Sequence, residues 1–253
     1  MSSMAVDEVP MIAPDWRVPA RVRAAFTLRL GGVSHAPYDS LNVGTHVEDS
    51  AAAVRENRRR LQERLQLPSE PVWLQQVHGV EVLDLDARGI SRAADAAVTR
   101  APGRVCVIQV ADCMPVLFAA RDGSAVGAAH AGWRGLAGGV LEATVRKLGV
   151  APDQLLAWLG PAISQEHFEV GDDVRDAFVS HDPSAGPAFV ANPRGRWQCN
   201  LYALARRRLA ALGVHDVSGG GWCTFADAAR FFSYRRDGQC GRMAALIWMT
   251  PPA

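Results

Sequence analysis

Three side chains in the first 130 residues could bind a metal ion together. They are His78, Cys113 and His130. Two imidazole nitrogens and one thiolate sulfur form a zinc ligand set, and three protein ligands leave the fourth tetrahedral position open to water or substrate. A single histidine or cysteine more often serves packing or hydrogen bonding. The prediction of a catalytic metal site therefore depends on the three residues meeting in the fold.

Strands are the elements that must bring these residues together. Two continuous apolar runs predict buried strands, one ending just before Cys113 and the other at His130. His78 ends a third strand candidate, before a glycine turn. Because the ends of neighbouring strands lie side by side, we expect the three donors within ligand reach. We predict strands at 22–30, 72–78, 80–85, 105–110, 115–120, 125–129, 155–159 and 244–249, helices at 50–67, 136–148, 170–179 and 200–212, and a polar loop at 183–196.

The order of these elements indicates the fold class. Strands and helices are mixed without a regular strand–helix–strand alternation, which favours a layered α/β or α+β sandwich over a doubly wound nucleotide-binding fold. Neither a repeat nor a linker divides the chain. We expect an N-terminal lead-in at residues 1–20 and a single catalytic domain at 21–253.

Composition excludes several classes of protein. The chain has 253 residues, 49% hydrophobic and 21% charged, which is typical of a globular protein. The net charge of +1 offers no general attraction to nucleic acid or membranes, and no apolar stretch is long enough to span a bilayer. Five cysteines at irregular spacings, with no C-x-x-C pair and no signal peptide before them, predict a reduced, cytoplasmic protein. We expect no obligate protein partner.

Nine sequence blocks carry a resemblance to a known family. They occur in a fixed order at 31–34, 40–44, 56–58, 76–79, 94–96, 111–116, 130–135, 159–163 and 233–236. Together they resemble the family first labelled polyphenol oxidase or laccase-like and later described as purine nucleoside phosphorylases, whose bacterial members are also called peptidoglycan editing factors. The resemblance extends from Ala25 to Met249.

The resemblance implies a fold, a cofactor and an activity. The fold is an α/β/α layered sandwich with a mixed sheet. The cofactor is zinc on His78, Cys113 and His130, with copper as an adventitious substitute. The activity is cleavage of adenosine, inosine and S-methyl-5′-thioadenosine by inorganic phosphate to the free base and the ribose 1-phosphate, with adenosine deamination as a side activity.

Further residues receive roles through the resemblance. Asn42 and Arg58 match substrate-site positions, and Arg58 is our first candidate for a phosphate clamp, assisted by Arg134 or Arg235, because guanidinium groups suit phosphate. Asp112, beside the catalytic-site Cys113, is the carboxylate nearest in sequence for proton transfer in deamination. Each also has a plain structural explanation: Arg58 as part of a charged helix face, Asn42 as a turn residue, and Asp112 as a support.

Three alternative functions stay open at this point. A zinc amide hydrolase acting on UDP-MurNAc-peptide cell-wall precursors would use the same ligands. A copper-loaded site could oxidise phenols weakly, but the seven histidines include no H-x-H pair, so a true multicopper laccase is not expected. A non-enzymatic zinc module would need a fourth ligand, and no residue with comparable context supplies one.

Overall fold

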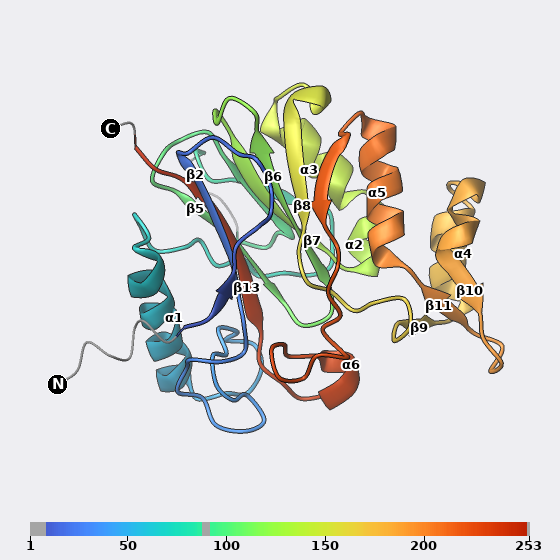
Figure 1. The fold of residues 1–253 in the computed structure, drawn as a ribbon, viewed down its shortest axis with the longest axis horizontal. Helices are drawn as coiled ribbons and strands as arrows, with labels where there is room; N and C mark the ends of the chain where they lie inside the picture. Colours follow the sequence, from blue (N-terminus) through green and yellow to red (C-terminus); the bar gives the residue numbers. More distant parts are fainter. Residues whose placement is uncertain (1–8, 88–91, 252–253) are drawn as a thin grey trace.

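The computed structural model describes residues 9–87 and 92–251, which form three sheets with helices on their outer sides (Figure 1). The strands are β1 Met11–Ile12, β2 Val22–Thr27, β3 Val82–Asp84, β4 Ala96–Thr99, β5 Val105–Val110, β6 Met114–Ala120, β7 Val126–Ala131, β8 Leu155–Leu159, β9 Glu169–Val170, β10 Phe189–Ala191, β11 Trp197–Cys199, β12 Asp216–Gly219 and β13 Met243–Met249. The α-helices are α1 Ala51–Leu65, α2 Trp133–Gly138, α3 Val140–Leu148, α4 Asp172–Val179, α5 Leu201–Leu212 and α6 Tyr234–Asp237, and 3-10 helices occupy Pro152–Gln154 and Pro183–Ala188.

Two large sheets pack face to face. One is antiparallel with the order β1-β2-β13-β5, and the other is mixed with the order β12-β8-β6-β7-β4-β3. Alternate residues of β5 face opposite sides: Cys106 and Ile108 join the core between the sheets, whereas Val105 and Val107 join the core on the outer side. Because both faces of β5 are apolar, the strand needs cover on both sides.

Helices supply that outer cover. Leu61 of α1 packs against Val107 and Trp248 on the outer face of the four-stranded sheet. Helices α2, α3 and α5 cover the outer face of the six-stranded sheet, and Figure 1 shows α1 and α5 on opposite sides of the strands. The predicted layered α/β fold with a mixed sheet is confirmed, with two sheets stacked between the helical layers. Within the described residues, none of the helices combines the length and the apolar character that a membrane span requires.

Local signals explain the best-predicted elements. Strands β5 and β8 have the predicted bounds. Helix α1 begins after Ser50, whose hydroxyl accepts from the Ala53 N–H, and α5 begins after Asn200, whose side chain accepts from the Ala203 N–H. Residues 1–8 of the predicted lead-in lie outside the described part, and Met11 and Ile12 pair with β2.

Other predicted elements were wrong in type or bounds. The segment 72–78 is not a strand and makes only isolated bridges, from Val72 to Cys106 and from Gln75 to Ala93. The helix expected at 136–148 breaks at Gly139, whose φ is 100°, and so becomes α2 and α3. The segment 183–196 holds a 3-10 helix and β10, because Phe189 is buried against Phe178 of α4. Strands β4, β9, β11 and β12 and the short helix α6 were not predicted.

Candidate metal centre and adjoining pockets

The structure brings the three predicted metal ligands together. One donor atom from each of His78, Cys113 and His130 lies within 4.8 Å of the other two. The Cys113 Sγ is 4.0 Å from the His78 Nε2, and the two imidazole rings meet edge to face with centroids 4.8 Å apart. His130 is buried, Cys113 is half-buried and His78 is exposed, so the group opens to solvent on the side of His78.

Each ligand is placed by a different element. Cys113 lies in the turn between β5 and β6, where the preceding residue Asp112 has a φ of 82°. His130 lies opposite Pro115 of β6, and β7 continues one residue past His130 to Ala131, whereas we predicted that the strand ends at His130. His78 lies in a loop with a φ of 61°, a left-handed backbone conformation that costs energy outside glycine.

Asp95, which the sequence analysis did not single out, supports two of the ligands. Its carboxylate accepts hydrogen bonds from the backbone N–H groups of Val77, His78 and Gly79 at 3.1, 2.9 and 2.7 Å. It also lies 2.8 Å from the His130 Nδ1. With Nδ1 donating to the carboxylate, the Nε2 of His130 is left to bind a metal. The only sequence signal for Asp95 was its place in the block 94–96.

The charges in this cluster are coupled. Burial alone would raise the pKa of the Cys113 thiol, but His130 and His78 outweigh it and lower that pKa to about 6. Burial alone would lower the pKa of His130, but the Cys113 thiolate and Asp95 raise it to about 9. Burial opposes ionisation of Asp95, and the hydrogen bonds from His130 and Gly79 nevertheless lower its pKa. Without a metal, the cluster therefore holds a thiolate, an imidazolium and a carboxylate at neutral pH.

A glycine leaves room for the thiol. A Cβ atom built on Gly132 would lie 2.8 Å from the Cys113 Sγ and 3.4 Å from the His78 Cδ2. One turn later, a Cβ on Gly135 would lie 2.9 Å from the carbonyl oxygen of Gly79. These two contacts account for the glycines of the block 130–135: one admits the metal ligands and the other lets α2 pack on the His78 loop.

The donor set fits a zinc ion. Zinc bonds of about 2.0 Å to nitrogen and about 2.3 Å to sulfur in tetrahedral geometry place the donors about 3.5 Å apart. The observed 4.0 Å between Cys113 Sγ and His78 Nε2 is within a small rotamer change of that spacing. In the described ranges, no other group of three histidine, cysteine or carboxylate donors meets in this way.

Two pockets of different character meet at the ligands. The first has a volume of about 430 Å³, and its walls include the polar side chains of His46, Gln76 and Arg242. The second has a volume of about 220 Å³, and its walls include Trp133 and Phe168. His78, Ala111, Cys113 and Tyr234 line both pockets. We call them the polar pocket and the aromatic pocket.

Two of the predicted substrate residues line the aromatic pocket. The Arg134 guanidinium lies 4.3 Å from the ring centroid of Trp133. The Arg235 guanidinium lies 5.1 Å from that of Phe168, and its Nη1 donates to the Glu169 carbonyl at 2.7 Å. Both cations are exposed and reach the pocket beside aromatic faces.

Asn42 and Arg58 are not among the residues that line either pocket. Asn42 is fully buried: its Oδ1 accepts from the backbone N–H groups of Gly44 and Arg242, and its Nδ2 donates to Asp49. Arg58 donates twice to the Val43 carbonyl and stacks 3.8 Å above the Trp73 ring. Burial lowers the pKa of Arg58 to about 10.

Arg58 still acts on the polar pocket through its charge. Burial lowers the pKa of His46, and the positive charges of Arg242 and Arg58 lower it further. Arg242, which the sequence analysis missed, is a pocket-lining cation about 100 residues beyond the metal ligands. Its only sequence signal was its position just before the last strand.

Asp112 is occupied by protein contacts. Its Oδ1 accepts from the Thr224 hydroxyl at 2.6 Å, and its Oδ2 accepts from the Ser233 hydroxyl at 3.0 Å and the Arg235 N–H at 2.7 Å. These bonds tie the Cys113 turn to the start of α6. The structural explanation for Asp112 thus has direct support in these contacts.

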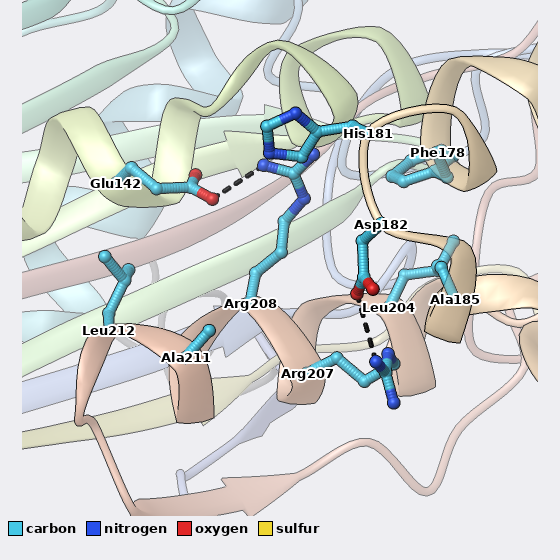
Figure 2. A pocket seen from close by; sticks show the side chains of 10 residues that line it. All are labelled: Glu142, Phe178, His181, Asp182, Ala185, Leu204, Arg207, Arg208, Ala211 and Leu212. Atoms are coloured by element: carbon cyan, nitrogen blue, oxygen red, sulfur yellow. Dashed lines mark hydrogen bonds and ion pairs between the residues drawn. The ribbon is translucent and has the colours of Figure 1, made fainter.

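A third cavity, of about 330 Å³, lies between α3, α4 and α5 (Figure 2). It shares no lining residue with the polar pocket or the aromatic pocket. Arg208 pairs there with Glu142 at 2.6 Å, and Arg207 pairs with Asp182 at 3.0 Å. Because this cavity shares no lining residue with the other two pockets, its residues provide control positions for substitutions.

Comparison with known proteins gives consistent matches over nearly the whole chain. Residues 23–250 match the model of the family described as multi-copper polyphenol oxidoreductase laccase. A purine nucleoside phosphorylase of Pseudomonas aeruginosa is 58% identical over 240 residues, which cover 94% of this chain and 98% of that one. The purine nucleoside phosphorylase YfiH of Escherichia coli is 50% identical over the same shares.

A solved structure has the same fold. The crystal structure of a Neisseria meningitidis protein from family DUF152 superposes with a TM-score of 0.92 at 48% identity, covering 95% of this chain and 99% of that chain.

Proposed function

The chain belongs to the family described as multi-copper polyphenol oxidoreductase laccase, and from that premise we propose that it is a zinc-dependent purine nucleoside phosphorylase. Its proposed substrates are adenosine, inosine and S-methyl-5′-thioadenosine. Relatives at 58% and 50% identity carry the name purine nucleoside phosphorylase. The observation that carries the proposal is the meeting of a polar and an aromatic pocket at His78 and Cys113.

The proposed reaction needs two kinds of binding surface. An oxygen of inorganic phosphate forms a bond to the ribose C1′, while the glycosidic bond breaks and its electron pair leaves with the base. The base takes the proton that the hydrogen phosphate dianion gives up, so that the products are the neutral base and the ribose 1-phosphate dianion. The site must hold a phosphate dianion on one side of C1′ and a flat heterocycle on the other, which requires cations and hydrogen-bond donors on one side and aromatic faces on the other.

The polar pocket suits the phosphate. Arg242 supplies a guanidinium in its wall, and the charge of Arg58 behind His46 adds to the positive potential. Guanidinium groups bind phosphate oxygens through paired N–H donors. Arg242 therefore takes the contact role that the sequence analysis gave to Arg58, and Arg58 contributes through its field and through its support of the Val43 carbonyl.

The aromatic pocket suits the purine. Trp133, Phe168 and Tyr234 offer ring faces and edges, and Arg134 and Arg235 place N–H donors near them. Stacking between such rings and a base is tolerant of the group at C6, so one pocket can accept both 6-amino and 6-oxo purines. This tolerance agrees with the proposed use of adenosine and inosine.

The proposed zinc ion would be held by His78, Cys113 and His130 and would supply Lewis acidity where the two pockets meet. The chain's own residues fix that position: Asp95 orients His130 and the His78 loop, and Asp112 holds the Cys113 turn. Both oxygens of Asp112 accept hydrogen bonds from the protein, so this carboxylate is poorly suited to transfer protons during deamination. Adenosine deamination is accordingly proposed as a side activity only.

The test is to strip the protein with a chelator, restore zinc, and follow adenosine and inosine by chromatography with and without phosphate. We expect free adenine and hypoxanthine only when phosphate is present. Arg242→Met should raise the KM for phosphate about 10- to 100-fold, the value of a charge-assisted hydrogen bond, with a small effect on the KM for nucleoside. Arg207→Met, in the separate cavity of Figure 2, is the matched control and should leave the KM for phosphate unchanged.

Other outcomes would each contradict a defined part of the proposal. Base release without phosphate would make the protein a nucleoside hydrolase. Inosine formed from adenosine without phosphate would make deamination the main activity. If the zinc-loaded protein released neither product, the purine assignment would fall and amide hydrolysis of cell-wall precursors would become the function to test.

A further inference from the structure

A second group of reactive side chains lies outside the metal centre. The Cys223 Sγ is 3.5 Å from the His167 Nδ1, and the Ser164 Oγ is 3.3 Å from the same nitrogen. The His167 ring stacks on Phe225 with centroids 4.6 Å apart and planes at 24°, which fixes its orientation. None of these residues lines the polar or the aromatic pocket.

The surroundings of the Cys223 sulfur favour a nucleophilic thiol. The backbone N–H groups of Ser164 and Ala226 both donate to it, each at 3.4 Å. Two backbone N–H donors therefore point at the sulfur, beside the His167 Nδ1. Cys223 is also half-buried rather than enclosed.

The other cysteines differ in exposure or in use. Cys106, Cys199 and Cys240 are at most 1% exposed. Burial raises the pKa of Cys199 to about 12, so its thiol stays protonated and inert at neutral pH. Cys113 belongs to the metal centre. Cys223 is thus the partly exposed cysteine that the metal site does not use.

We propose that Cys223 is a modification site, a thiol activated by His167 that reacts with hydroperoxides. In this step the thiol proton passes to the His167 Nδ1, and the sulfur attacks one peroxide oxygen. A sulfur–oxygen bond forms as the oxygen–oxygen bond breaks, and the leaving hydroxide takes the proton from His167 to become water. Sulfur is oxidised by two electrons to a sulfenic acid, and hydrogen peroxide is reduced to water.

The site is connected to the metal centre through the next residue. The Thr224 hydroxyl donates to Asp112 at 2.6 Å, and Asp112 directly precedes Cys113. The Thr224 N–H donates to the Ala162 carbonyl at 3.0 Å, and the Arg236 Nη1 donates to the Thr224 carbonyl at 2.9 Å. An oxygen atom added to the Cys223 sulfur would crowd the adjacent Thr224 and its hydrogen bonds. Modification should therefore loosen the turn that holds Cys113.

The test uses the zinc-loaded full chain, hydrogen peroxide, a sulfenic-acid trap and tryptic peptide mapping. Cleavage at arginine separates the relevant thiols, because Cys223 lies in the peptide 209–230, Cys199 in 197–206 and Cys240 in 237–242. We expect trapping at Cys223 at least about tenfold faster than at Cys199 or Cys240. Equal rates at the three cysteines would overturn the proposal.

Two variants separate activation from simple exposure. His167→Asn should slow trapping at Cys223 about tenfold or more, because it removes the base that takes the proton. His181→Asn, in the cavity of Figure 2, is the matched control and should leave the rate unchanged. An unchanged rate in a folded His167→Asn protein, checked by circular dichroism, would refute activation by His167.

The coupling to the metal centre has its own readout. Zinc release to a chromophoric chelator should be faster after oxidation of the wild-type protein, and this acceleration should be missing in Cys223→Ser. An equal acceleration in both proteins would place the effect at Cys113 and overturn the coupling. Neither readout depends on the nucleoside reaction, so failure of the proposed function leaves this proposal testable.

Discussion

Substitution of Asp95 by asparagine tests how the metal centre is built. The Asp95 carboxylate is fully buried and accepts from His130 and from the N–H groups of Val77, His78 and Gly79. An asparagine has nearly the same shape, but its single amide oxygen offers about two acceptor sites where a carboxylate offers about four. Two of the four donors would then face an NH2 group.

The expected loss follows from those bonds. A hydrogen bond to a charged group contributes about 1.5–3 kcal/mol, so two lost bonds predict a fall of about 3–6 kcal/mol in the free energy of unfolding. For a chain of this length the lower figure corresponds to a fall of about 6–12 °C in Tm. Because Asp95 also orients His130, zinc affinity should fall about 10- to 100-fold.

Two assays separate the structural loss from the metal loss. Guanidinium unfolding of the metal-free proteins measures the structural loss, and competition with a chromophoric chelator measures zinc affinity. The control is Asp176→Asn, an exposed carboxylate with one ion pair to Arg175 at 3.6 Å. Unchanged stability of the metal-free Asp95→Asn protein together with unchanged zinc affinity would refute this account of the site.

The pH dependence has a defined sign. The pKa of Asp95 is lowered by folding, so its contribution is present above the unfolded value of about 3.9 and is lost as pH falls through the folded value. The pKa of His130 is raised to about 9, so its contribution is present below the unfolded value of about 6.5 and is lost as pH rises through 9. The stability gap between the metal-free wild type and Asp95→Asn should therefore narrow at both extremes.

Three further predictions follow from the same contacts. Gly132→Ala, whose Cβ would lie 2.8 Å from the Cys113 Sγ, should lower zinc affinity about tenfold or more in the chelator assay, and unchanged affinity would contradict the packing argument. Zinc affinity measured by calorimetry should fall as pH falls, because binding displaces the His130 proton below about pH 9 and the Cys113 proton below about pH 6; a flat profile would contradict these pKa values. Asn57→Ala removes a fully buried amide with four hydrogen bonds and should cost about 2–4 kcal/mol in guanidinium unfolding without changing zinc affinity.

The meeting of the three candidate metal ligands was predictable because each depends on a local pattern. Cys113 and His130 adjoin long apolar runs, and buried strands of this kind lie side by side in a sheet. The structure bears out the meeting of both with His78. The second sheet layer was not predictable, because an apolar run shows that both faces of a strand are covered but does not show whether a helix or a sheet covers them.

The supporting residues were harder to predict because they act across long sequence separations. Asp95 bonds the His78 loop and a histidine on another strand, and Arg242 reaches the polar pocket from the far end of the chain. Asn42 and Arg58 match sequence blocks with substrate roles, and their side chains form hydrogen bonds to the loops around Gly44 and Val43. Their substrate roles stay predictions, because a sequence block places a residue near a site without showing which group it contacts.

The ligand set itself bears on the family's description as a laccase. Two histidines and a cysteine are also the main ligands of blue-copper electron-transfer sites, and a multicopper oxidase adds a cluster of further imidazoles to such a site. Here His78 is exposed, two pockets open onto the group, and the described residues hold no second group of three donors. A three-ligand centre that faces two binding pockets is suited to act on a bound substrate. Group transfer therefore agrees with this architecture better than multicopper oxidation does.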